Sequence, residues 1–153
     1  MSYVTFYNGP DAPRPNMPTH LGANAIITWE GKLLLERRRD SDTWGLIGGG
    51  CKKYETGRQA IVRETYEELG LRIDANRFEK LAVYDNPGRV AAYRDGSTWR
   101  MVIVVYGLEL EGQPRLRISA ESRELRFFTR EEVRNLTIPV THADIVEEQF
   151  LNR

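Results

Sequence analysis

The sequence predicts an α/β fold in which helices cover both faces of a central mixed sheet, an α/β/α sandwich. Short apolar runs bounded by glycine, proline and polar residues recur along the chain, as expected of strands. Two substantial segments, residues 56–69 and 141–151, show helical apolar spacing instead. Because strands and helices are interspersed, we expect layers of helix packed on a sheet.

Length and composition narrow the possible classes of protein. A chain of 153 residues is most simply one domain. Lys and Arg together number 22, as do Asp and Glu, so there is no global basic field, which argues against a nucleic-acid partner. The single cysteine, Cys51, permits no internal disulfide, and we interpret it as a small neutral loop residue. No apolar run is long enough for a membrane span and no signal-peptide pattern is present, so we expect a cytoplasmic protein.

The first elements are expected to be an arm and a hairpin. Residues 1–19 include four prolines and show no regular period, which predicts an irregular N-terminal arm before a single domain at 20–153. The arm is a candidate dimer contact, so a homodimer stays open. Two apolar runs, 21–29 and 32–37, flank a turn at Gly31 and predict a β-hairpin that is covered on both faces.

Further elements follow the first helix. In chain order we expect a strand at 72–84, an extended loop at 85–97, a strand at 98–110, a short strand at 124–128, a helix capped by Thr129 and a last helix at 141–151. The two long strands should form a second hairpin. His142 is expected to be a surface or first-turn histidine, and Trp44 to pack its loop against the core.

The helix that begins near residue 56 has one acidic face. Thr56 followed by Gln59 forms a capping box, which predicts the start of the helix. At 100° per residue, Glu64, Glu67 and Glu68 gather on one side, away from the apolar side. Their mutual repulsion favours a bound cation, and carboxylates suit a hard divalent ion such as Mg²⁺. A solvated acidic face is the alternative interpretation of three glutamates alone.

The residues around these glutamates follow a known spacing. In order they are Gly49, five residues, Glu55, seven residues, Arg63-Glu64, Thr65, one residue, Glu67-Glu68, one residue, and Gly70-Leu71. This resembles the Nudix box, GX5EX7REUXEEXGU, with every fixed position filled. The preceding stretch, LLLERRRDSDTWGLIGGG, extends the resemblance over residues 21–71. Four departures are Thr65 for a bulky aliphatic residue, Lys52 for an acidic one, Tyr54 for glycine and Ile47 for the proline common before the glycines.

The resemblance implies a Nudix fold and a hydrolase that uses Mg²⁺ or Mn²⁺ and a water nucleophile. It implies that Glu67 and Glu68 ligate metal, that Glu64 is a ligand or the base, and that a carbonyl of Gly48 or Gly49 completes the shell. Further roles are implied for Arg63, which would orient the carboxylates, for Glu55, which would support the loop or the site, and for an additional glutamate outside the box, Glu121 or the alternative Glu124, with Glu121 favoured.

The substrate is less constrained by the sequence. We interpret Arg38 and Arg39, which precede the glycines, as candidate phosphate contacts, and Tyr54 and Asn86 as candidate substrate contacts in loops. The resemblance implies a nucleoside diphosphate linked to another group, with ADP-ribose or a nucleotide sugar as first choice. A nucleoside triphosphate pyrophosphohydrolase is the alternative, and a non-catalytic nucleotide sensor is a third hypothesis.

Overall fold

The computed structural model describes residues 4–39 and 41–153. Within them, nine strands form a curled sheet with the path β1-β7-β8-β2-β3-β4, to which β5, β6 and β9 are added. The sheet is mixed because β2 (His20–Trp29) and β8 (Thr98–Glu109) are parallel, whereas the other described pairings are antiparallel. The remaining strands are β1 (Val4–Asn8), β3 (Lys32–Arg38), β4 (Trp44–Gly45), β5 (Ile47–Gly50), β6 (Glu79–Tyr84), β7 (Arg89–Tyr93) and β9 (Ser122–Phe128).

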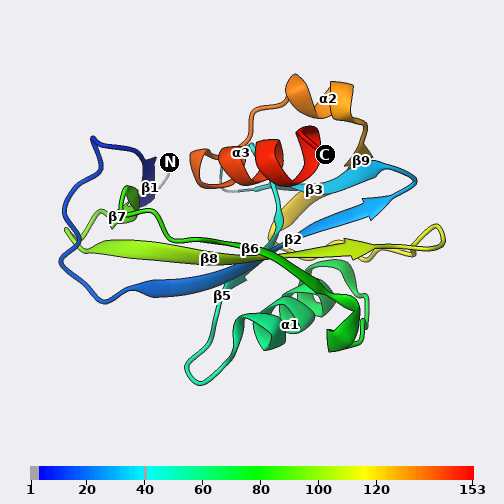
Figure 1. The fold of residues 1–153 in the computed structure, drawn as a ribbon, viewed down its shortest axis with the longest axis horizontal. Helices are drawn as coiled ribbons and strands as arrows, with labels where there is room; N and C mark the ends of the chain where they lie inside the picture. The colour runs from blue at the N-terminus through cyan, green and yellow to red at the C-terminus, as the bar shows by residue number, and fades with distance from the viewer. Residues whose placement is uncertain (1–3, 40) are drawn as a thin grey trace.

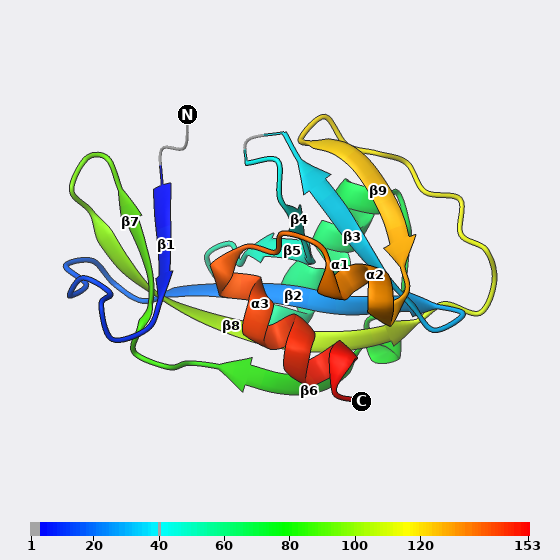
Figure 2. The ribbon, with the colours of Figure 1, turned by 90° about the horizontal axis from the view of Figure 1, so that it is seen from above.

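Helices lie on both sides of this sheet. The helix α1 (Gly57–Leu69) covers one face, and α2 (Arg130–Arg134) and α3 (Val140–Val146) lie on the other, as Figure 1 shows. Seen from above, α3 crosses β2 and β8, and β1 and β7 lie beyond the start of α3 (Figure 2), where Asn8 of β1 donates to Asp144 at 3.2 Å. The predicted α/β class, with a mixed sheet between helical layers, is confirmed.

The two layers enclose two apolar clusters, and β3 shows how one strand contributes to both. Leu34 packs with Ile61 and Leu69 of α1, whereas Leu33 and Leu35 belong to the cluster that contains α3. Successive side chains on a strand point to opposite faces. The uninterrupted apolar run therefore reflects burial on both faces, as predicted.

The helix α1 begins and ends where its sequence indicates. The side chain of Thr56 accepts a hydrogen bond from the backbone amide of Gln59, and the Gln59 side chain accepts one from the Thr56 amide, which completes the predicted capping box. Gly70 ends the helix in the left-handed conformation with φ of 74°, which glycine adopts without steric cost. Thr65, the departure from an aliphatic residue, is buried, and its hydroxyl donates to the carbonyl of Ile61 at 2.6 Å.

The N-terminal arm is not irregular throughout, which corrects one prediction. Val4–Asn8 forms β1 and pairs with β7 from Val4↔Tyr93 to Asn8↔Arg89. Its β-branched and aromatic residues favour extended backbone, and the four prolines come only after it. The prediction of an extended loop at 85–97 was also wrong, because this segment contains the strand β7. Residues 1–3 of the predicted arm lie outside the described part.

Other boundaries differ more modestly. The glycine-rich segment Ile47–Gly50 is a strand that pairs with β2, although no strand was predicted there. The strand expected at 72–84 starts only at Glu79, after a 3₁₀ turn at Ala75–Arg77. The last helix comprises α3 and a π-helical turn, η2 (Glu147–Leu151), with Ile145, Val146 and Phe150 buried as expected. Among residues 4–39 and 41–153, no helix has the length and apolar character needed to cross a bilayer.

Candidate active site

The strand β5 approaches α1 so closely that it needs glycine. Gly48 has φ of 139°, and a side chain there would collide with the backbone of Ala23 on β2. A Cβ at Gly49 would lie 2.8 Å from Oε1 of Glu64. The glycines therefore bring the β5 backbone into contact with the carboxylates of α1.

Arg63 connects three of these carboxylates. Its guanidinium forms a two-point contact with Glu55, with Nε to Oε2 at 2.8 Å and Nη2 to Oε1 at 2.9 Å. Nη1 donates to Glu64 at 2.9 Å and to Glu67 at 3.1 Å, and Nη2 also donates to the carbonyl of Gly50 at 3.0 Å. Such charge-assisted contacts fix both partners. Hydrogen bonds from Arg63 and from the Lys52 amide lower the pKa of Glu55 to about 2.

Glu68 lies deeper and forms a buried acidic pair with Glu36. The two residues are 5% and 2% exposed, respectively. Oε2 of Glu68 accepts from the Gly48 amide at 3.0 Å, and Glu36 accepts from Ser122 at 2.7 Å and from Arg38 at 3.1 Å. Burial raises the pKa of both carboxyls, and the charge of Glu36 raises that of Glu68 further. A cation at this position would relieve the repulsion.

Glu36 is a site residue that the sequence interpretation missed. It ends the apolar run Leu33–Leu35 on β3, two residues after Leu34, whose side chain faces α1. Residues two apart on a strand share a face. A carboxylate continuing a buried run toward the glutamate helix was therefore the available signal.

The predicted phosphate contacts lie at the edge of this centre. Arg38 contacts Glu36 and is one third exposed. Arg39 is exposed, and its amide donates to the carbonyl of Glu121 at 3.2 Å. Glu121 is also exposed; it precedes Ser122, and its charge acts on Glu36. Glu121 is thus beside the buried pair, and its catalytic role stays a prediction, as does that of the alternative, Glu124, which contacts Arg126.

Two other predicted contacts are placed differently. Tyr54 is 93% exposed and has φ of 70°, a left-handed backbone conformation that glycine adopts more readily than tyrosine. Asn86 donates to Asn8 at 2.6 Å and accepts from Arg89 at 3.3 Å, so its side chain connects β1 to β7. Neither of these two hydrogen bonds involves a carboxylate of α1. The role of Asn86 in substrate binding stays a prediction.

His142 is a first-turn histidine, which is one of the two placements predicted for it. It lies in the first turn of α3, is partly buried, and its Nδ1 accepts from the Leu46 amide at 3.1 Å. Burial, followed by the positive charges of Arg38 and Arg89, lowers its pKa to about 4. The histidine therefore acts as a neutral acceptor that attaches α3 to the segment before β5. Burial also raises the pKa of the Cys51 thiol, which disfavours the thiolate.

The donor set of the site fits a divalent cation of the magnesium type. Within the described residues, no three acidic, His or Cys side chains already converge as a closed metal cage. Mg²⁺ does not require one, because it commonly binds one or two carboxylates and keeps several waters. Glu64 and buried Glu68, next to the backbone of Gly48 and Gly49, offer such a partial set. The ligand roles of these residues and of Glu67, which is 49% exposed, stay predictions.

The comparison with protein families agrees with this geometry. The family model described as the NUDIX domain matches residues 18–149. The chain belongs to the Nudix family. The match covers the buried acidic pair, the Arg63 contacts and the glycine-rich strand. The protein is accordingly a Nudix pyrophosphohydrolase that acts on nucleotide derivatives, and the predicted family is confirmed.

Individual similar proteins fall within this family. A MutT-like protein of Streptomyces ambofaciens is 30% identical over 123 residues, 80% of this chain and 71% of that protein. The nucleoside triphosphatase NudI of an Enterobacter strain is 30% identical over 96 residues, 62% of this chain and 67% of its own. The Nudix domain of Shewanella oneidensis NrtR, solved in complex with ADP ribose, has a TM-score of 0.67 at 19% identity, covering 86% of each chain. That last likeness shows the fold alone.

Proposed function

We propose that this Nudix enzyme is a divalent-metal-dependent hydrolase that cleaves the diphosphate linkage of a nucleoside diphosphate joined to another group. The single observation that carries the proposal is the carboxylate cluster at the β5–α1 contact, where Arg63 holds Glu55, Glu64 and Glu67 beside buried Glu68. A bound Mg²⁺ or Mn²⁺ would neutralise the diphosphate oxygens and lower the pKa of a water.

The protein groups would divide the remaining work. Glu64 and Glu68 would hold the cation, with Glu67 as a further ligand close to the solvent, and the carbonyl of Gly48 or Gly49 would add a donor. Glu64 or Glu121 would accept the proton of the attacking water. Arg38 and Arg39, at the end of β3, would contact phosphate oxygens, where guanidinium groups can bind two oxygens at once. Phosphoryl attack then depends mainly on alignment and charge stabilisation.

ADP-ribose or a nucleotide sugar is the first candidate substrate. The ADP ribose complex of the NrtR domain supports it, since a fold of the same kind accommodates that ligand. A nucleoside triphosphate is the second candidate, favoured by the 30% identity to a nucleoside triphosphatase. Both contain the phosphoanhydride that the cluster would cleave.

A substrate panel separates these candidates. The full chain would be incubated with ADP-ribose, nucleotide sugars and nucleoside triphosphates, each with Mg²⁺ or Mn²⁺ and each with EDTA. Products would be resolved by ion-exchange chromatography. AMP plus ribose 5-phosphate from ADP-ribose supports the first candidate, and a nucleoside monophosphate plus pyrophosphate supports the second. Absence of metal-dependent cleavage across the panel would contradict the proposed activity.

A further inference from the structure

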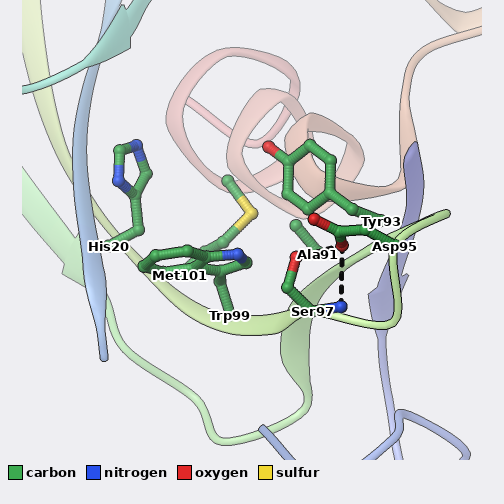
Figure 3. Close-up of a pocket in the computed structure, with 7 residues that line it drawn as sticks. All are labelled: His20, Ala91, Tyr93, Asp95, Ser97, Trp99 and Met101. Carbon is green, nitrogen blue, oxygen red and sulfur yellow. Dashed lines mark hydrogen bonds between the residues drawn. The ribbon is translucent and has the colours of Figure 1, made fainter. Parts of the chain in front are cut away.

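A cavity of about 380 Å³ lies on the β7–β8 hairpin, outside the carboxylate cluster. Its volume falls within the range of about 300–1,000 Å³ that is typical of small-molecule sites. Apolar and polar groups face it together, as Figure 3 shows: an indole, a phenol and a thioether, with a carboxylate, a hydroxyl and an imidazole. These belong to Trp99, Tyr93, Met101, Asp95, Ser97 and His20.

Strand alternation explains why these groups share one face. Ala91 is paired with Trp99 across the hairpin, and residues two apart on each strand point the same way. Tyr93 is therefore on the face of Ala91, and Met101 is on that of Trp99. Because Ala91 has only a methyl group, the side of the indole opposite it stays open to form the cavity.

The hairpin turn presents an oriented carboxylate to this space. Oδ1 of Asp95 accepts from the Ser97 amide at 2.8 Å and from the Ser97 hydroxyl at 2.6 Å. These hydrogen bonds lower the pKa of Asp95, so it is ionised at neutral pH. The N-terminal arm holds the turn in place, because Asn16 bonds to Gly96 and to Thr98. These hydrogen bonds therefore fix both the turn and the orientation of the Asp95 carboxylate.

The cavity adjoins the candidate catalytic centre through His20. His20 pairs with Met101 at the start of β2, and a Cβ at Gly50 would lie 2.6 Å from its Nε2. The carbonyl of Gly50 is itself bound by Arg63, which holds the acidic cluster. One side of the imidazole therefore lines the cavity, and it lies against the end of the strand that carries the site.

We propose that this cavity is the nucleobase subsite of the enzyme, with Trp99 as the stacking platform and Asp95 as the acceptor for an exocyclic amino group of the base. The inference rests on the proposed function, since it places the base beside the centre that would cleave the diphosphate. An indole stacks on any base, so Trp99 supplies affinity with little selectivity. A carboxylate selects the amino-bearing bases adenine, guanine and cytosine, because it repels the flanking carbonyls of uracil.

Binding measured without turnover tests this assignment. Isothermal titration calorimetry in EDTA would compare AMP, GMP, CMP, UMP and ribose 5-phosphate as probes. We expect wild type to bind an amino-bearing nucleotide at least about tenfold more tightly than ribose 5-phosphate, and Trp99→Ala to abolish that difference. Asp95→Asn should equalise UMP with the amino-bearing nucleotides. The control is Val83→Ala, which removes an exposed apolar side chain from β6, a strand that does not line the cavity.

Several results would overturn the subsite. They are equal binding of ribose 5-phosphate and nucleotides by wild type, no binding of any of the five probes, or unchanged nucleotide affinity in folded Trp99→Ala. If Trp99→Ala does not fold, Tyr93→Ala carries the test, because Tyr93 is 45% exposed and its removal leaves the core intact. Cleavage of the substrate panel by wild type reports on the proposed function separately, so the two failures are distinguishable.

Discussion

Arg63 is the residue that gives the acidic cluster its arrangement. It lies on α1 between Glu55, which precedes the helix, and Glu67, one turn later, and it is itself 20% exposed. A planar guanidinium can satisfy a two-point contact with Glu55 while its other nitrogen binds Glu64, whereas an ammonium cannot. The cluster therefore depends on the shape of this cation as well as on its charge.

Replacing Arg63 by lysine tests this dependence. Arg63→Lys keeps the charge and loses the fork, so we expect the pKa of Glu55 to rise from about 2 toward its ordinary value near 4.5. Carboxyl titration by NMR would measure that shift. Hydrolysis of the preferred panel substrate should fall by about tenfold or more, as for other residues that orient metal ligands. Arg115→Lys, at an exposed position, is the control, and an unchanged Glu55 pKa would refute the role.

Glu36 shows what residue patterns on their own did not reveal. The box spacing identified Glu64, Glu67 and Glu68 because they share one helix, where periodicity is visible in the sequence. Glu36 joins them from a strand 32 positions before Glu68, and only the packing of β3 behind β5 and α1 brings the two carboxyls together. Alternation could have placed Glu36 on the correct face, although it does not say which helix covers that face.

Among the elements, α3 is attached to the sheet by polar contacts as well as by its apolar stripe. His142 accepts from the Leu46 amide, and Arg89, which is fully buried, donates to the Thr141 carbonyl at 2.5 Å and to Asp144 at 2.6 Å. Arg89 comes from β7, so the helix is bound both to the segment before β5 and to the hairpin. Each of these bonds requires a defined protonation state.

The neutral state of His142 predicts a pH dependence of stability. The folded pKa is about 4 and the ordinary value is 6.5, so between them the unfolded chain holds more protons. The free energy of unfolding should therefore fall as the pH drops from 6.5 to 4, by about 2–3 kcal/mol after allowing for partial exposure. Urea denaturation at several pH values would measure it.

His142→Asn is the matched variant for this effect. The amide oxygen of asparagine can accept from Leu46 as Nδ1 does, without titrating. The difference between wild type and variant should therefore shrink as the pH is lowered, and this comparison cancels the contribution of Glu36, Glu68 and other carboxyls. A pH-independent difference would show that His142 does not titrate on unfolding as described.

At the scale of the whole molecule, local patterns predicted what local interactions determine. The caps of α1, the hairpin of β2 and β3, and the two-sided apolar strands all follow from neighbours in the sequence. The pairing of β1 with β7 was not predicted, because it joins residues 4–8 to residues 89–93. Each segment alone is short and flanked by polar residues, so its sequence does not distinguish a strand from a loop. The cavity beneath Tyr93 and Trp99 depends on that pairing, so it too was out of reach of sequence patterns.

The central claim is that Glu68, buried beside Glu36 at the glycine strand, belongs to the metal-dependent catalytic centre. The most direct measurement is the Mg²⁺-dependent hydrolysis rate of Glu68→Gln on the preferred panel substrate, together with its melting temperature. Glu147→Gln, at an exposed position on the last helix, is the control. We expect kcat/KM to fall by about 100-fold or more with no loss of thermal stability. Burial raises the pKa of Glu68 to about 10, so its carboxyl is neutral without a cation, and glutamine is also neutral and keeps an acceptor for the Gly48 amide. Near-normal activity of a folded Glu68→Gln protein would contradict the account.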